Sequence, residues 1–195
     1  MDINVLLFDD FETLDVFGPV EIFGHGPEYT LRYVSAEGGV VKSRHGAEIM
    51  TEPIVNADFS AILLIPGGFG TRPLVDDFAY IEELTEIAAQ SAFCLTVCTG
   101  SGLLAKTGLL DGRRATSNKR AFAWAKSVNP AVDWVEHARW VRDGKFYTSS
   151  GVSAGMDMAL GFIADRLGIE QAGEIASAIE YIWNTDKDND PFAIA

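Results

Sequence analysis

Short apolar segments alternate along the chain with longer amphipathic segments of helical length. The apolar runs predict buried strands, and apolar residues repeated three and four positions apart predict helices. The predicted strands are residues 3–8, 30–35, 61–65, 92–97 and 113–116, with shorter ones at 132–135, 139–141 and 145–148. The predicted helices begin at Gly18-Pro19, Leu74, Thr99, Lys119, Ser153 and Glu170.

This alternation is typical of an α/β fold, in which helices cover both faces of a mostly parallel sheet. The three short strands are interpreted as an antiparallel addition with a turn at Asp143-Gly144. At 195 residues the chain suits one domain, residues 1–195, around a single core. The acidic segment 184–190 is expected to form a surface loop.

The charge balance argues against several classes of partner. Fifteen basic residues against 28 acidic ones give a formal net charge of −13, which repels nucleic-acid phosphates and anionic lipid surfaces. The first residues lack the basic region of a secretory signal, and no apolar run approaches the roughly 18 residues of a membrane helix. We therefore expect a soluble cytoplasmic protein that binds neither nucleic acid nor membrane.

The chain has only two cysteines, Cys94 and Cys98. Four residues along a strand separate their Cα atoms by about 13 Å, which is too far for a disulfide. A structural metal is not expected either, because no second cysteine pair or histidine pair accompanies them. Cys94 lies in the middle of a strand and is interpreted as an ordinary buried residue.

Cys98 stands where the apolar run 92–97 passes through small residues into a helix. This layout is typical of a nucleophile elbow, which exposes a reactive side chain above the carboxyl edge of a sheet. A helix N-terminus is expected to lower the pKa of the thiol below its free value of about 8.5. A buried, inert cysteine is the alternative.

Two further clusters follow predicted strands. Gly67 and Gly68 end the run 61–65 and could offer backbone N–H groups as an oxyanion site, although a plain glycine turn has the same pattern. Asp15 and Glu21 flank the Gly-Pro helix start, where a carboxylate could act as acid or base. Asp15 is the better candidate; a solvated charge is the alternative for either.

Together these segments resemble the ThiJ/PfpI branch of the class I glutamine amidotransferase-like superfamily, from Ile3 to about Phe192. The resemblance is carried by residues 14–19 (LDVFGP), 65–68 (IPGG), 97–100 (VCTG), 108–116 (GLLDGRRAT) and 150–157 (SGVSAGMD). The Cys-Thr-Gly turn is most similar to that of isonitrile hydratases and of sensor domains in AraC-type regulators.

The resemblance implies a flavodoxin-like fold and a homodimer. It also implies that Cys98 is the nucleophile, Asp15 its acid/base partner and Thr99 a neighbour of the thiol, with Gly67 and Gly68 as backbone donors. Two positions depart from the family pattern. Hydratase-like relatives often have Thr-His-Trp at residues 117–119, where this chain has Ser-Asn-Lys, and protease-like or glyoxalase-like members have histidine at Thr99.

A Cys-His-carboxylate triad is therefore not expected. The three histidines lie outside these motifs and are interpreted as structural or surface residues: His25, His45 and His137. The leading hypothesis is hydration of a small isonitrile to an N-substituted formamide by Cys98 and Asp15, without a metal or organic cofactor. The alternatives are a glyoxalase-like reaction on small aldehydes and a non-enzymatic redox-sensing or ligand-sensing domain.

Overall fold

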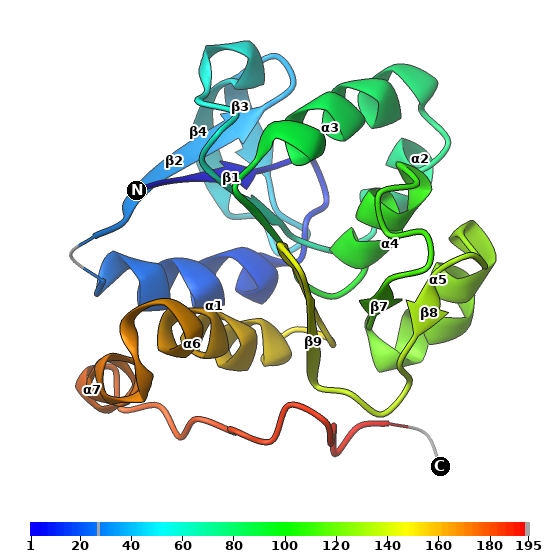
Figure 1. Ribbon diagram of the computed structural model, residues 1–195. Helices are drawn as coiled ribbons and strands as arrows, with labels where there is room; N and C mark the ends of the chain where they lie inside the picture. The colour runs from blue at the N-terminus through cyan, green and yellow to red at the C-terminus, as the bar shows by residue number, and fades with distance from the viewer. Residues whose placement is uncertain (27, 194–195) are drawn as a thin grey trace.

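The computed structural model describes residues 1–26 and 28–193 and is built around one eight-stranded sheet (Figure 1). The strands in chain order are β1 (Asp2–Leu6), β2 (Thr30–Ser35), β3 (Gly39–Lys42), β4 (Glu48–Pro53), β5 (Ile62–Ile65), β6 (Phe93–Thr96), β7 (Arg114–Ala115), β8 (Asp133–Trp134), β9 (Trp140–Asp143) and β10 (Phe146–Ser149). The order in the sheet is β3-β4-β2-β1-β5-β6-β10-β9, and only the two edge strands, β3 and β9, run antiparallel to their neighbours. Strands β7 and β8 pair separately, in parallel.

Helices cover both faces of this sheet. They are α1 (Thr13–Gly24), α2 (Thr71–Leu74), α3 (Phe78–Gln90), α4 (Gly100–Lys106), α5 (Phe122–Val128), α6 (Ala154–Leu167) and α7 (Ile169–Ala178), with 3-10 turns at Ile54–Asn56 and Lys119–Ala121. Figure 1 shows α1, α6 and α7 on one side of the sheet and α3 and α4 on the other. In the described part of the chain, no helix combines the length and apolar character needed to cross a bilayer.

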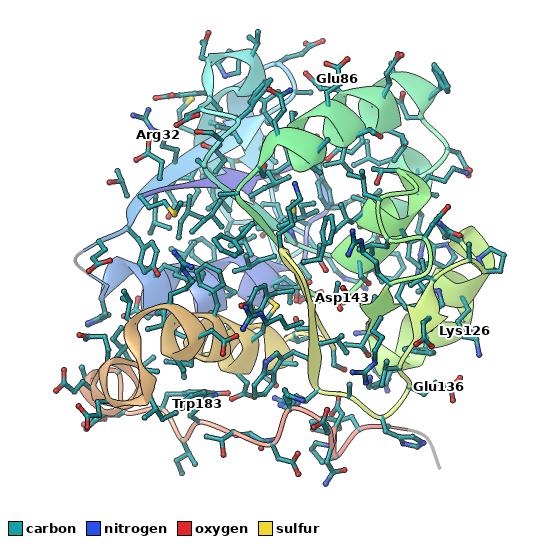
Figure 2. The ribbon with its side chains drawn as sticks, viewed as in Figure 1. Arg32, Glu86, Lys126, Glu136, Asp143 and Trp183 are labelled. Atoms are coloured by element: carbon teal, nitrogen blue, oxygen red, sulfur yellow. The ribbon has the colours of Figure 1, made fainter. Side chains whose placement is uncertain are left out.

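The core lies between the sheet and these helices. All four residues of β5 are fully buried, as expected of a central parallel strand that is covered on both faces. Phe162 of α6 packs edge to face against Phe23, Phe93 and Tyr147, which joins α1, α6 and the sheet. Charged side chains such as those of Arg32, Glu86 and Lys126 lie at the periphery (Figure 2).

The α/β fold is confirmed, and so are several of its details. Helices α4, α6 and α7 begin within one residue of the predicted positions. The antiparallel pair β9–β10 turns at Asp143-Gly144, where Gly144 has a φ of 60°. The prediction for 132–135 was wrong, because β8 pairs in parallel with β7 and does not join the antiparallel addition.

The predicted helix start at Gly18-Pro19 was wrong. Helix α1 begins at Thr13, and the buried Pro19 lies inside it. Helix α1 packs closely on α6 at this point, since a Cβ on Gly18 would lie 2.7 Å from Cγ of Met156. The hairpin of β3 and β4 was not predicted, since both strands lie at or near the sheet edge and carry few buried apolar residues.

The segment 184–190 is largely a surface loop, as predicted, but its last residue is anchored. The side chain of Asp190 is buried, and its backbone N–H donates to the carbonyl of His137 at 2.7 Å. The guanidinium of Arg139 lies between two carboxylates, with Nε 2.6 Å from Asp157 and Nη1 3.4 Å from Asp190. The tail is therefore tied to α6 through a buried ion-pair network.

Candidate active site

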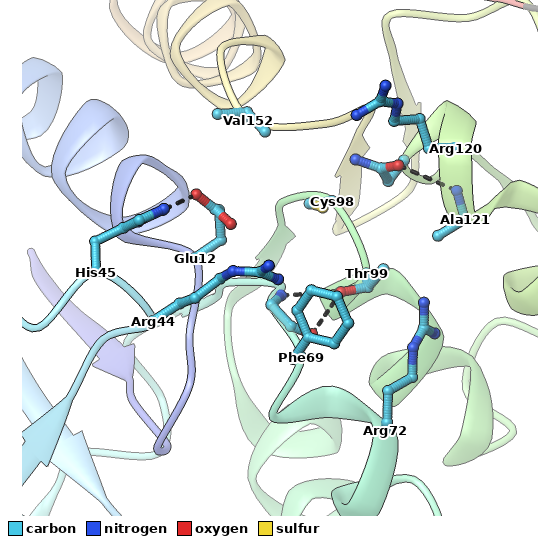
Figure 3. A pocket seen from close by; sticks show the side chains of 12 residues that line it. Glu12, Arg44, His45, Phe69, Arg72, Cys98, Thr99, Arg120, Ala121 and Val152 are labelled. Carbon is cyan, nitrogen blue, oxygen red and sulfur yellow. Dashed lines mark hydrogen bonds and ion pairs between the residues drawn. The ribbon is translucent and has the colours of Figure 1, made fainter.

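The predicted site residues meet at the carboxyl edge of the sheet. Asp15 lies in the first turn of α1, which follows β1; Gly67 and Gly68 follow β5; Cys98 and Thr99 follow β6. These three strands are parallel neighbours, so their carboxyl ends share one edge. Figure 3 shows Cys98 and Thr99 within the pocket formed there.

Cys98 forms the predicted elbow. Its φ of 57° lies in the left-handed region, which costs free energy for a residue that is not glycine. Hydrogen bonds to both the N–H and the carbonyl of Cys98 hold the turn. The N–H of Cys98 donates to the carbonyl of Ser150 at 3.0 Å. The carbonyl of Cys98 accepts from the hydroxyls of Ser101 and Ser117, each at 3.0 Å. This conformation is therefore fixed by its surroundings.

Glycine is required where the loop after β5 meets the start of α4, at Gly67 and Gly100. A Cβ on Gly67 would lie 2.5 Å from the backbone nitrogen of Thr99 and 2.8 Å from Cβ of Cys98. A Cβ on Gly100 would lie 2.5 Å from the carbonyl oxygen of Ile65. The two loops approach so closely that any side chain at either position would push the thiol away from the end of β5.

Asp15 is fully buried and has no cationic partner among the described residues. Its Oδ2 accepts a hydrogen bond from the N–H of Gly67 at 2.8 Å, while Oδ1 has no partner in the described structure. Burial raises the pKa of Asp15 to about 8, and the Gly67 hydrogen bond offsets only part of that rise. Asp15 therefore holds its proton at neutral pH, next to the thiol of Cys98.

The structure contradicts the expectation of a low thiol pKa. Burial raises the pKa of Cys98, and the Asp15 carboxylate, when ionised, raises it further. The N–H groups of Thr99 and Val152 and the amide of Asn118 face the sulfur and lower the pKa, but less than burial raises it. Helix α4 has only seven residues, so its N-terminus offers little compensation.

The backbone donors differ from those predicted. The N–H of Gly67 is used by Asp15, and the N–H of Gly68 donates to Oγ1 of Thr99 at 3.0 Å. The donors that face the sulfur are instead the N–H groups of Thr99 and Val152. Val152 has a φ of 50° and lies in the segment 150–157, a motif of the resemblance to which the sequence attached no role.

Asn118 was also missed as a site residue. Its Oδ1 accepts from the N–H of Ala121 at 3.1 Å, which leaves Nδ2 facing the sulfur of Cys98. Gly151 makes room for this amide, because a Cβ there would lie 2.2 Å from Nδ2. At residue 118 this chain thus places a hydrogen-bond donor that does not titrate.

A cavity of about 540 Å³ opens above Cys98, and the sequence did not indicate that Glu12, Arg44 and Val152 belong to its wall. Besides Gly68, Cys98, Thr99, Asn118, Ala121 and Val152, it is lined by Glu12, Arg44, His45, Phe69, Arg72 and Arg120. His45 is exposed, as expected, yet lines the cavity: its Nδ1 lies 3.0 Å from Oγ1 of Thr13 and 3.6 Å from Oε1 of Glu12. Arg44 and His45 lie in the β3–β4 turn, so missing that hairpin hid them. The described residues include no cluster of three or more His, Cys, Asp or Glu suited to a metal.

A thiol on a strained strand-to-helix turn, next to a buried carboxyl at the carboxyl edge of a parallel sheet, defines a cysteine-centred site on a flavodoxin-like fold. The chain belongs to the DJ-1/PfpI family, whose family model matches residues 1–165.

Curated relatives and a solved structure agree with this assignment. The chain is 30% identical to an isonitrile hydratase of Pseudomonas putida, over 93% of this chain and 78% of the relative. It is also 30% identical to the HTH-type transcriptional regulator CdhR of Pseudomonas aeruginosa, over 78% of this chain but only 45% of the regulator. A crystal structure of a ThiJ/PfpI family protein from Pseudomonas syringae matches with a TM-score of 0.82 at 27% identity, covering 98% of this chain and 77% of that one.

Proposed function

We propose that this chain is a cofactor-independent enzyme that hydrates a small isonitrile to an N-substituted formamide, with Cys98 as nucleophile and Asp15 as acid/base. The observation that carries the proposal is the fully buried carboxyl group of Asp15, which has no cationic partner among the described residues and lies next to Cys98, whose thiol lines the cavity. The terminal carbon of an isonitrile carries a lone pair, so it needs a proton and a nucleophile at the same atom. This pair supplies both.

In the first step Asp15 transfers its proton to the terminal carbon, and the sulfur of Cys98 bonds to that carbon. The thiol proton moves to the Asp15 carboxylate, which restores the acid. The product is a thioimidate, in which the former isonitrile carbon is bonded to hydrogen, sulfur and nitrogen. No free thiolate is needed, which agrees with the raised pKa of Cys98.

In the second step water adds to the same carbon. Asp15 gives its proton to the substrate nitrogen and accepts one from the water, which forms a tetrahedral adduct. The carbon–sulfur bond then breaks, and the proton of the adduct's hydroxyl passes through Asp15 to the sulfur. The products are the formamide and the regenerated thiol, so one water is consumed per isonitrile.

The two alternatives require other protonation states of Asp15 and Cys98. A glyoxalase-like reaction requires a base that removes a carbon-bound proton, whereas Asp15 is an acid at neutral pH. Redox sensing by oxidation favours a thiol with a low pKa, whereas the pKa of Cys98 is raised. The two pKa directions favour hydration over glyoxalase-like chemistry and over redox sensing.

The test is direct assay of purified protein with n-butyl isonitrile, with N-butylformamide measured by mass spectrometry. We expect product from the wild type and from Cys94→Ser, a matched control at a buried thiol whose pKa is raised to about 12. Cys98→Ser is expected to form none above buffer. Absence of product from the wild type with both n-butyl isonitrile and isocyanoacetate, while an isonitrile hydratase assayed in parallel turns over, would overturn the proposal. The homodimer and the cytoplasmic location stay predictions.

A further inference from the structure

The cavity above Cys98 is strongly cationic, although the whole chain carries a formal charge of −13. Arg44 comes from the β3–β4 turn, Arg72 from α2 and Arg120 from the 3-10 turn before α5. Figure 3 shows these three side chains around Cys98, each from a different segment. Glu12 is the one acidic side chain among the described residues that line the cavity. Acidic surface elsewhere therefore surrounds a positive pocket.

These arginines are not committed to partners within the protein. Over residues 1–26 and 28–193, none of the three guanidinium groups lies within 4.0 Å of a carboxylate oxygen. By contrast, Arg113 and Arg142 both do, at 3.2 and 3.1 Å. The positive charges of the cavity are therefore available to a ligand.

Two of the guanidinium groups are held in place by aromatic rings. The guanidinium carbon of Arg72 lies 3.5 Å from the ring centroid of Trp124, and that of Arg44 lies 3.9 Å from that of Phe69. Stacking fixes the plane of a guanidinium and leaves the N–H groups on its edge free to donate. Nη1 of Arg72 is buried without a hydrogen-bond partner in the described structure. A buried donor without a partner costs free energy, which an acceptor on a ligand would recover.

We propose that this cavity selects small organic anions, so that the electrophile attacked by Cys98 carries a carboxylate held by Arg72, with Arg44 and Arg120 adding positive charge. Planar guanidinium groups bind carboxylates through paired, charge-assisted hydrogen bonds. Asp15 does not oppose such a ligand at neutral pH, because its proton is retained. On the proposed function, on which this inference rests for the reacting group, the substrate class is an isonitrile that carries a carboxylate.

The test compares two alkylating reagents of nearly equal size, anionic iodoacetate and neutral iodoacetamide. Their rates at Cys98 are measured by intact mass in a Cys94→Ser background, so that only one thiol reports. We expect the ratio of the iodoacetate rate to the iodoacetamide rate to be at least about tenfold higher at Cys98 than at 2-mercaptoethanol. Added salt is expected to lower this ratio, because it screens the attraction.

Arginine variants show which side chain causes the preference for iodoacetate. Arg72→Gln is expected to lower the ratio about tenfold, and Arg44→Gln or Arg120→Gln only a few-fold, because these two side chains are exposed. Arg32→Gln makes the same charge change at a surface ion pair far from the cavity and is expected to leave the ratio unchanged. A ratio equal to that of 2-mercaptoethanol, or no alkylation of Cys98 by iodoacetate, would overturn the inference.

This alkylation test does not depend on hydration. If the proposed function also holds, kcat/KM for isocyanoacetate exceeds that for its uncharged methyl ester in the wild type, and Arg72→Gln reduces the difference. An intact preference for iodoacetate without turnover of either isonitrile would overturn the hydratase proposal and support anion selection. Turnover of the ester at the same kcat/KM as the anion would support hydration and overturn anion selection.

Discussion

The molecule buries carboxyl groups in two regions, one that pairs the carboxyl with a cation and one that does not. Beneath the C-terminal tail, the fully buried Asp157 accepts from Arg139 at 2.6 Å, from the hydroxyl of Tyr181 at 3.0 Å and from the N–H of Asn184 at 3.0 Å. At the carboxyl edge of the sheet, the equally buried Asp15 accepts one backbone N–H and has no cation beside it.

The difference separates a structural carboxyl from a reactive one. A buried carboxylate that is paired and hydrogen-bonded stays in its charged form and holds segments together. A buried carboxyl without a cation keeps its proton, and it can give that proton to a substrate. Asp157 thus fixes the tail to α6, whereas Asp15, in the function proposed above, supplies a proton next to Cys98 at a cost in folding free energy.

The largest expected effect is a loss of stability when the buried ion pairs of Arg139 are removed. Arg139→Met leaves Asp157 buried without its cation and leaves Asp190 with Lys119 alone, at 4.0 Å, so we expect the free energy of unfolding to fall by about 3–5 kcal/mol. Urea denaturation measures it. Arg142→Met removes an exposed ion pair with Asp165 and is the control, with an expected change below about 1 kcal/mol. Equal losses in the two variants would contradict a structural role for the buried network.

Replacement of the buried Asp15 is expected to change stability in the opposite direction, that is, to increase it. The unfolded chain ionises Asp15 near pH 4, whereas the folded protein ionises it near pH 8. Between these pH values the folded protein binds one proton more than the unfolded chain. The free energy of unfolding therefore falls as pH rises from about 4 to about 8. Asp15→Asn removes this cost and is expected to stabilise the protein by up to about 4 kcal/mol at pH 7, with little gain at pH 4.

Urea denaturation of wild type and Asp15→Asn at several pH values measures that gain. The same variant is expected to lose isonitrile turnover by about 10²-fold or more, because an amide cannot supply the proton. A gain in stability that does not change with pH, or a loss of stability at pH 7, would contradict the assignment of Asp15 as a buried neutral acid.

The pH dependence of activity sharpens the comparison further. Since the proposed mechanism uses Asp15 as an acid, it predicts that kcat/KM stays level below pH 8 and falls about tenfold per pH unit above it. An enzyme that needed a free thiolate from Cys98 would show the reverse, an increase through the same range. Initial rates of isonitrile consumption across pH distinguish the two profiles.

The smallest expected effect concerns the donors to the sulfur. Asn118→Ala removes one hydrogen bond that favours the thiolate, so the pKa of Cys98 should rise further. We expect alkylation of Cys98 by iodoacetamide at fixed pH to slow by about tenfold or less, since one hydrogen bond to a charged group is lost. Thermal denaturation checks that the fold is retained, and an unchanged rate would show that Asn118 does not act on the thiol.

The sequence predicted the features that depend on local pattern. The apolar runs of β5 and β6 and the small residues after Cys98 are contiguous, so they located the sheet and the elbow and brought Asp15 to the same edge. Val152, Asn118 and Arg44 reach the site from distant segments, and no local pattern shows that these segments meet at Cys98. The thiol pKa was misjudged for a related reason, because burial of Cys98 depends on packing of the whole chain.

The proton that Asp15 holds beside Cys98 is central to the mechanism, and infrared difference spectroscopy observes it directly. Spectra of the wild type minus Asp15→Asn, recorded across pH, separate the carbonyl stretch of a carboxylic acid from the stretch of a carboxylate. We predict that the acid band of Asp15 is present at pH 7 and disappears near pH 8. An acid band already lost near pH 4, the ordinary range of an aspartate, would show that Asp15 is ionised at neutral pH and would contradict its role as proton donor.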